Sequence, residues 1–136
     1  MQATGGMEMT IKLFLSILGA LGVLHGLAFV IVPGTVDTLY GLAASEPVAL
    51  MSRFFGGALI AWGGILWATR SFRDESAIRA VLQCTAVADA VGFLTAIVGT
   101  TAGTLNASGW IPVVIYAFGT AGSIYFLAGQ KKLVAV

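Results

Sequence analysis

Residues 11–34 read IKLFLSILGALGVLHGLAFVIVPG, and this stretch decides the class of fold. Its only side chain with a full charge is that of Lys12, at the very start. A run of about 20 mostly apolar residues is long enough to cross the hydrocarbon core of a bilayer as one helix. Pro33 ends the run, because proline lacks the backbone N–H that a continuing helix needs. The run is too long for a secretory signal peptide and has no small-x-small cleavage site before Pro33.

Further runs of the same kind follow along the chain. The second begins after Ser45-Glu46-Pro47, a sequence typical of a helix start. Because the connections between runs are short, consecutive helices should be antiparallel neighbours. The loop over residues 34–45 is long enough for a short interfacial helix around residues 36–40. We therefore predict an all-α fold: one transmembrane domain over residues 1–136, an up-down four-helix bundle with spans at about 11–32, 47–69, 75–99 and 109–129.

The composition agrees with a chain covered by lipid. Of the 136 residues, 58% are hydrophobic and only 10% are charged, whereas a soluble domain carries roughly 25% charged residues. The net charge of +1 and the lack of a basic patch argue against binding to nucleic acid. A single cysteine, Cys84, excludes an intramolecular disulfide and a CxxC redox pair, and a single histidine excludes bis-histidine haem ligation within one chain. We expect no cofactor.

The positions of the basic residues predict the orientation in the membrane. Cytoplasmic segments next to membrane spans are enriched in Lys and Arg. With an even number of spans, the basic residues that flank them fall on one side, apart from Arg53: Lys12, Arg70, Arg73, Arg79, Lys131 and Lys132. The opposite side carries Asp37 and Glu46, with Arg53 toward that face. Both termini should therefore be cytoplasmic.

Small residues predict where the helices approach closely, since lipid offers no hydrophobic drive for helix association. The spacing Gly22-xxx-Gly26 in the first span fits this pattern, and so does Gly57-xxx-Ala61 in the second.

Polar side chains inside the predicted spans mark a candidate site. An ionisable group in the membrane costs about 2.5–3.5 kcal/mol on insertion scales, so it needs a partner, a cavity or a function. At about 1.5 Å of helix rise per residue, these side chains fall in one layer of the outer half of the bilayer. Thr85 lies one turn below the aspartate and extends the layer. The members are His25, Arg53, Thr85, Asp89 and Tyr116.

This layer has three interpretations. In the first, Arg53 and Asp89 form a structural ion pair and Tyr116 donates a hydrogen bond to it. In the second, the layer recognises the polar end of a ligand in a cavity open to the outer leaflet. In the third, it carries proton-coupled chemistry, with His25 or Asp89 as the proton carrier. We predict no metal site, because the layer offers too few His, Cys and carboxylate ligands.

The layout also resembles a known group of proteins. The relevant features are a glycine-rich first span closed by Pro33, the segment Arg53-Phe54-Phe55-Gly56-Gly57 early in the second span, and a loop of glycine and polar residues before Gly109-Trp110-Ile111-Pro112. In these features the chain resembles the small four-helix bacterial membrane proteins of the DoxX-like type. The resemblance implies a compact bundle in a bacterial cytoplasmic (inner) membrane, acting as a subunit of a larger assembly. It carries over no catalytic residue.

Two functions from different classes follow. The sequence favours an accessory or structural subunit that packs against other membrane subunits or against copies of itself. This role is non-enzymatic, and it fits the lack of a cofactor motif and of a complete catalytic set. The alternative is a protein, or an enzyme, that binds a lipophilic molecule such as a quinone, an isoprenoid or a lipid in an outer-leaflet pocket.

Overall fold

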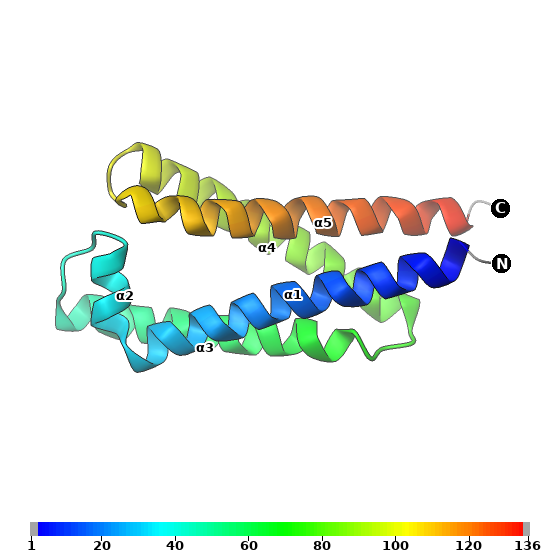
Figure 1. The fold of residues 1–136 in the computed structure, drawn as a ribbon, viewed down its shortest axis with the longest axis horizontal. Helices are drawn as coiled ribbons and strands as arrows, with labels where there is room; N and C mark the ends of the chain where they lie inside the picture. The colour runs from blue at the N-terminus through cyan, green and yellow to red at the C-terminus, as the bar shows by residue number, and fades with distance from the viewer. Residues whose placement is uncertain (1–2, 135–136) are drawn as a thin grey trace.

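Four long helices build the protein (Figure 1). The computed structural model describes the backbone of residues 3–134 and the side chains of residues 10–129. The segments long and apolar enough to cross a membrane are Thr10–Ile31, Glu46–Thr69, Glu75–Thr101 and Ala107–Gly129. They confirm the predicted all-α bundle and its four spans. In chain order the elements are α1 (Ala3–Ile31), α2 (Pro33–Leu39), α3 (Glu46–Thr69), α4 (Glu75–Thr101), the short 3-10 helix η1 (Ala107–Gly109) and α5 (Trp110–Val134).

Side chains next to the helix ends explain where α3 and α4 begin. The Ser45 hydroxyl accepts a hydrogen bond from the backbone N–H of Val48, 3.5 Å away, and Pro47 occupies the first turn of α3. Asp74 accepts hydrogen bonds from the backbone N–H and the hydroxyl of Ser76 at 2.9 and 2.8 Å. These bonds lower the pKa of the exposed Asp74 carboxyl. The carboxylate therefore stays ionised at the N-terminus of α4, where the helix dipole favours a negative charge.

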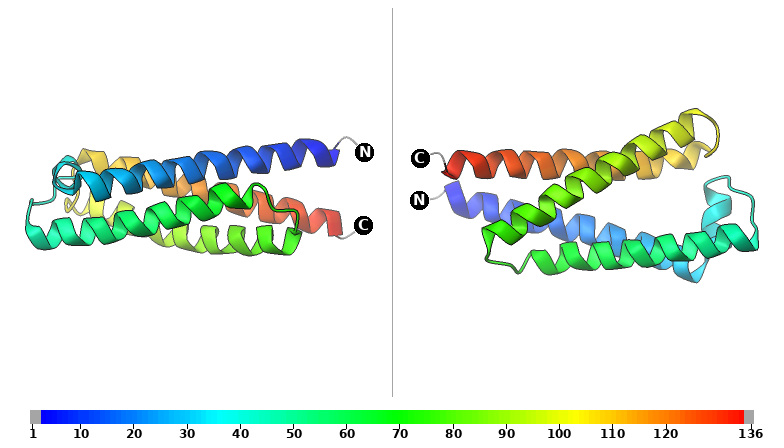
Figure 2. Two further views of the ribbon diagram at one scale, coloured as in Figure 1. Left: turned by 90° about the horizontal axis from the view of Figure 1, so that it is seen from below. Right: turned by 180° about the vertical axis from the view of Figure 1, so that it is seen from behind.

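The helices pack as two antiparallel hairpins, α1 with α3 and α4 with α5 (Figure 2). In the first hairpin the backbones meet at two glycine pairs. A Cβ atom added to Gly26 would lie 2.6 Å from the carbonyl oxygen of Gly56, and one added to Gly63 would lie 2.6 Å from that of Gly19. The predicted Gly57-xxx-Ala61 contact is wrong, since a Cβ at Gly57 would meet no atom within 4 Å. The contact face of α3 carries Gly56 and Gly63 instead, two turns apart.

We define the distal end as the end of the bundle that contains α2 and lies away from the termini (Figure 1). At this end the two hairpins are in contact through α2, the residues that follow it and the turn before α5. The predicted helix in the first outer loop is confirmed as α2, which begins and ends slightly earlier than expected. Asn106, in the turn before α5, donates hydrogen bonds to the carbonyl oxygens of Leu39 and Tyr40 at 2.9 and 3.0 Å. Gly41 permits this approach with a φ of +81°, in the left-handed region that favours glycine. We call this contact the distal clasp.

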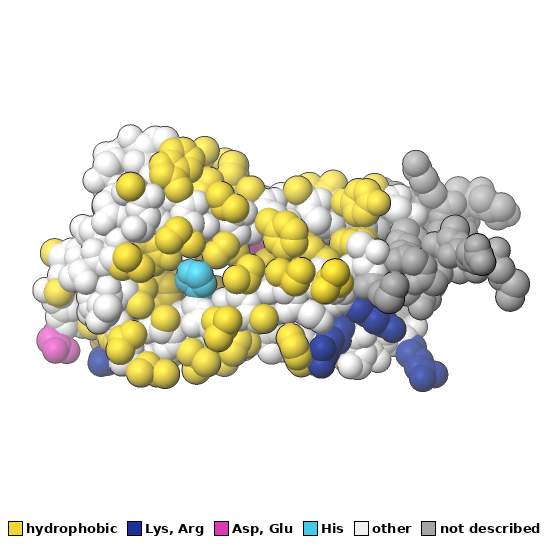
Figure 3. All heavy atoms as spheres, in the orientation of Figure 1, with side chains coloured by type: hydrophobic (Ala, Val, Ile, Leu, Met, Phe, Trp, Pro, Cys, Tyr) yellow, Lys and Arg dark blue, Asp and Glu magenta, His cyan; other side chains and the backbone are white. Residues whose placement is uncertain are grey.

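The best-packed apolar core lies in the half of the bundle nearer the termini. Leu15, Leu66 and Leu82, from α1, α3 and α4, are almost completely buried there. Elsewhere apolar side chains cover much of the outer surface, as expected for a surface in contact with lipid (Figure 3). At the end of α3 the Arg70 guanidinium lies 3.9 Å from the centre of the Trp67 ring. This cation–π pair is typical of a membrane–water interface.

Candidate functional site

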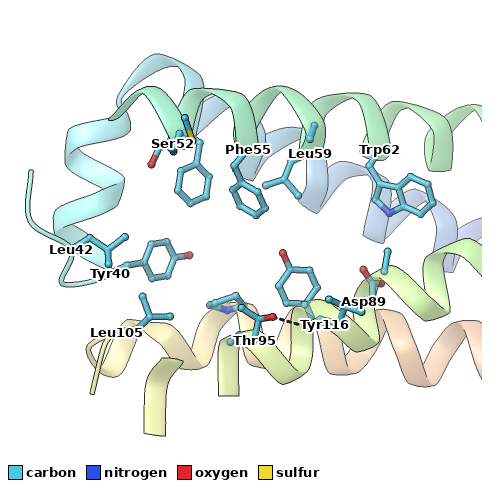
Figure 4. Close-up of a pocket in the computed structure, with 18 of the residues that line it drawn as sticks. Tyr40, Leu42, Ser52, Phe55, Leu59, Trp62, Asp89, Thr95, Leu105 and Tyr116 are labelled. Carbon is cyan, nitrogen blue, oxygen red and sulfur yellow. Dashed lines mark hydrogen bonds between the residues drawn. The ribbon is translucent and has the colours of Figure 1, made fainter. Parts of the chain in front are cut away.

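A cavity of about 840 Å³ lies between the two hairpins and reaches from the distal end to the middle of the bundle. It exists because α4 diverges from α3 toward the distal end (Figure 2). Its walls carry apolar and aromatic side chains with a few polar groups, the usual character of a small-molecule site. Figure 4 shows Phe55, Leu59 and Trp62 of α3 on one side and Asp89 and Tyr116 on the other. The remaining lining residues are Phe29, Tyr40, Leu42, Pro47, Val48, Met51, Ser52, Ala58, Ala88, Val91, Gly92, Thr95, Ala96, Leu105 and Pro112.

Aromatic rings from three elements form the distal half of the lining. The Phe29 ring stacks on the Tyr40 ring with centroids 6.1 Å apart and planes 9° apart. Phe29 also meets the edge of Phe55, with centroids 5.2 Å apart and planes at 82°. Burial raises the pKa of the Tyr40 hydroxyl, so the group stays neutral and can donate a hydrogen bond. These contacts hold together side chains of α1, α3 and the residue that follows α2 around the distal part of the cavity.

Asp89 and Tyr116 meet the cavity at its inner end, where α4 lies against α5. Asp89 is 5% exposed, and its Oδ2 is buried with no hydrogen-bond partner. This oxygen lies against Gly119 so closely that any Cβ there would overlap it. The Tyr116 ring lies over Gly92, where a Cβ would come within 2.7 Å of it. Each glycine therefore makes room for the polar side chain opposite.

The predicted pairing of Arg53 with Asp89 is wrong. Arg53 is exposed, and among the described residues no ion pair joins the two side chains. The reason is the helix face: the α3 side chains that line the cavity follow a stripe through Ser52, Phe55 and Trp62. Arg53 is turned about 100° from Ser52 and shares its face with exposed residues. The carboxyl of Asp89 consequently has no basic partner in the described part of the chain.

His25 and Thr85 lie outside the lining of the cavity. His25 is half-buried, and its Nε2 lies 3.4 Å from the hydroxyl of Tyr40, so it contacts the site through that tyrosine. Thr85 is fully buried and donates its hydroxyl to the Val81 carbonyl of the preceding turn at 2.7 Å. Thr85 therefore does not extend the network of Asp89. Of the predicted layer, only Asp89 and Tyr116 face the cavity together.

A second buried carboxyl, that of Asp37, lies near the site, although the sequence predicted only a charge in the outer loop there. Asp37 on α2 is completely buried and accepts a hydrogen bond from the Ser52 hydroxyl at 2.5 Å. Its other oxygen, Oδ2, has no partner. Ser52 also lines the cavity, so the Asp37–Ser52 bond holds α2 over the distal end of the wall formed by α3. Trp62, at the inner end, was likewise not predicted, although its spacing from Phe55 and Leu59 follows the helix repeat.

The cavity is blind at its inner end. Beyond Asp89 and Trp62 the interior is filled by a packed apolar cluster: Phe14, Leu15, Leu18, Leu66, Leu82 and Phe126. In the part of the chain that the structure describes, no three His, Cys, Asp or Glu residues gather closely enough to hold a metal ion. What the arrangement offers is an apolar volume with a carboxyl, a phenol and an indole at its end. It can hold a molecule that is mostly apolar and polar at one end.

No family model matches this chain, and neither a curated protein nor a solved structure is significantly similar to it.

Proposed function

We propose that this protein binds a lipophilic molecule in the cavity between its two hairpins. The observation that carries the proposal is the cavity itself, about 840 Å³ in volume and lined mainly by apolar and aromatic side chains. Ligand pockets are typically about 300–1,000 Å³, with a few convergent polar groups. Quinones, isoprenoids and lipids are the classes that would reach such a site from the bilayer.

The blind inner end supports binding over passage across the membrane. Leu15, Leu66 and Leu82 are each at most 1% exposed and lie between the cavity and the end with the termini. A channel would need a continuous polar or hydrated path. The polar groups at the inner end of the cavity, on Asp89, Tyr116 and Trp62, also support binding over a purely accessory role, because a few convergent polar groups in an apolar pocket are typical of a ligand site.

The first prediction is that filling the cavity abolishes binding. Ala58 on α3 and Ala88 on α4 both line the cavity, and both are exposed, so larger side chains there do not disturb the buried core. The double variant Ala58→Phe/Ala88→Phe should lose the lipid that co-purifies with the wild-type protein in mild detergent. Native mass spectrometry, followed by identification of the released lipid, measures this loss.

A matched control uses Ala61→Phe/Ala80→Phe, which places phenylalanines on exposed faces of the same helices outside the cavity lining. It should keep the bound molecule. If both double variants retain the same lipid, or if the wild-type protein carries none and is always recovered with the same membrane partner, the accessory role replaces the binding role.

We also propose that both termini lie on the cytoplasmic side of a bacterial cytoplasmic membrane, following the basic residues and the DoxX-like resemblance. The second prediction tests this orientation in a Cys84→Ala background. Cysteines introduced at Thr104 and Ser71, both exposed, should behave oppositely toward an impermeant maleimide on intact cells. Thr104→Cys should react and Ser71→Cys should not. Labelling of Ser71→Cys alone would place the termini outside.

A further inference from the structure

The carboxyl of Asp89 is the feature of the cavity that most constrains its ligand. It is 5% exposed, it lines the cavity, and the described part of the chain gives it neither a hydrogen bond nor an ion pair. Asp89 lies roughly 18 Å along α4 from the distal end of that helix, which is near the middle of a bilayer. A carboxylate at this depth is costly unless a positive charge or a hydrogen-bond donor accompanies it.

No Lys or Arg among the described residues lines the cavity, and Arg53 points away from it. An anionic head group would therefore meet a carboxyl without any compensating positive charge. A neutral head group can share a hydrogen bond with the carboxyl group, but it supplies no positive charge. A cationic head group neutralises that charge and supplies N–H donors to it.

The aromatic rings around the cavity also favour a cationic head group. Aromatic side chains line it from several elements, namely Phe29, Tyr40, Phe55, Trp62 and Tyr116. Aromatic faces attract cations, and the attraction is stronger where water is excluded. Figure 4 shows Trp62 and Tyr116 on opposite sides of the inner end, with Asp89 beside them. The carboxyl of Asp89 and the rings of Trp62 and Tyr116 therefore lie around the same part of the cavity.

We propose that the ligand of the cavity is a cationic amphiphile, with an amine or quaternary ammonium head at Asp89 and an apolar body lying along the rings toward the distal end. This proposal rests on the proposed binding function, and it adds the charge of the ligand. Opposite charges at Asp89 and the head group leave the complex neutral within the membrane.

A matched series of probes with one chain length tests the charge preference. Dodecylammonium, dodecanol and dodecanoate are titrated against the protein in nanodiscs of uncharged lipid, and saturable binding is measured after subtraction of empty nanodiscs. Affinity should fall in the order ammonium, alcohol, carboxylate, with about tenfold or more between the first two, as expected for a charge-assisted hydrogen bond. Asp89→Asn, which keeps the size of the side chain, should remove the preference for the ammonium over the alcohol. Arg53→Gln should leave the order unchanged.

Equal affinity for the ammonium and the alcohol would overturn the cationic ligand while leaving the binding function intact. The same conclusion would follow if Asp89→Asn kept the ammonium preference. Saturable binding of none of the probes, or binding that Ala58→Phe/Ala88→Phe does not reduce, would instead count against the binding function itself. The two proposals therefore fail on different results.

Discussion

Replacing Gly63 by valine should separate α1 from α3 and destabilise the protein by about 3 kcal/mol, the upper end of the range for overpacking. A Cβ at this position would lie 2.6 Å from the Gly19 carbonyl oxygen and 2.7 Å from the Val23 backbone nitrogen. Backbone atoms cannot rotate away as a flexible side chain can, so the whole helix must move. Unfolding by sodium dodecyl sulfate added to mixed micelles, followed by circular dichroism, measures the loss.

Gly64 provides the matched control on the next residue. A Cβ there would have no atom within 4 Å, because Gly64 is turned about 100° from Gly63 and is exposed. Gly64→Val changes helix propensity by the same amount as Gly63→Val, so the difference between the two variants isolates the helix–helix contact. Equal stability of the two variants would show that the glycine pairs do not hold the hairpin together.

Ser52→Ala should be the second most damaging of these changes, at about 2–3 kcal/mol, because it leaves a buried carboxyl without its hydrogen bond. Asp37 is 0% exposed, and the Ser52 hydroxyl is its side-chain donor among the described residues. Asp37→Ala should also destabilise, but the double variant should lose less than the sum of the single losses. Residues in direct contact typically couple by about 0.5–3 kcal/mol.

The same mixed-micelle unfolding applied to the four members of this cycle gives the coupling. Arg53→Ala serves as the neighbouring control, since Arg53 is exposed and a surface substitution normally changes stability by less than about 0.5 kcal/mol. Simple additivity of the Asp37 and Ser52 changes would mean that their hydrogen bond does not stabilise the packing of α2 on α3.

The membrane spans could be predicted because hydropathy depends only on the composition of each segment. The start of α3 was predictable from Ser45-Glu46-Pro47, because the Ser45 side chain and the proline act on the first turn of their own helix. The residues at which two helices meet were harder to predict from the sequence. Gly56 and Gly57 are adjacent in sequence but lie on different faces of α3, and only the packing of α1 decides which face is buried. The small-xxx-small spacing was therefore right for Gly22 and Gly26 in α1 and wrong for Gly57 in α3.

The sequence predicted how deep in the membrane the site residues lie, but not toward which neighbour each side chain points. Counting residues along the helices placed Asp89, Tyr116 and Arg53 at similar levels, but the rotation of each helix sets which side chains meet. Arg53 lies off the stripe of Ser52 and Phe55 that lines the cavity, so the expected ion pair does not form. The burial of Asp37 could not be predicted from the sequence for another reason. It depends on the packing of α2 on α3, which is a contact between segments separated by a loop. The sequence favoured the role of an accessory subunit, whereas the cavity favours the binding of a lipophilic molecule.

The distal clasp bears on how the protein is made. Each hairpin buries its own helix contacts, and Asn106 of the second hairpin bonds to Leu39, which lies 67 residues earlier in the chain, and to Tyr40. During biosynthesis the residues up to Thr69 can enter the bilayer and pair as a unit before α4 and α5 have left the ribosome. The clasp can close only after the second hairpin has inserted. Two polypeptides divided in the loop between Thr69 and Glu75 therefore contain all the parts needed to assemble the whole protein after separate synthesis.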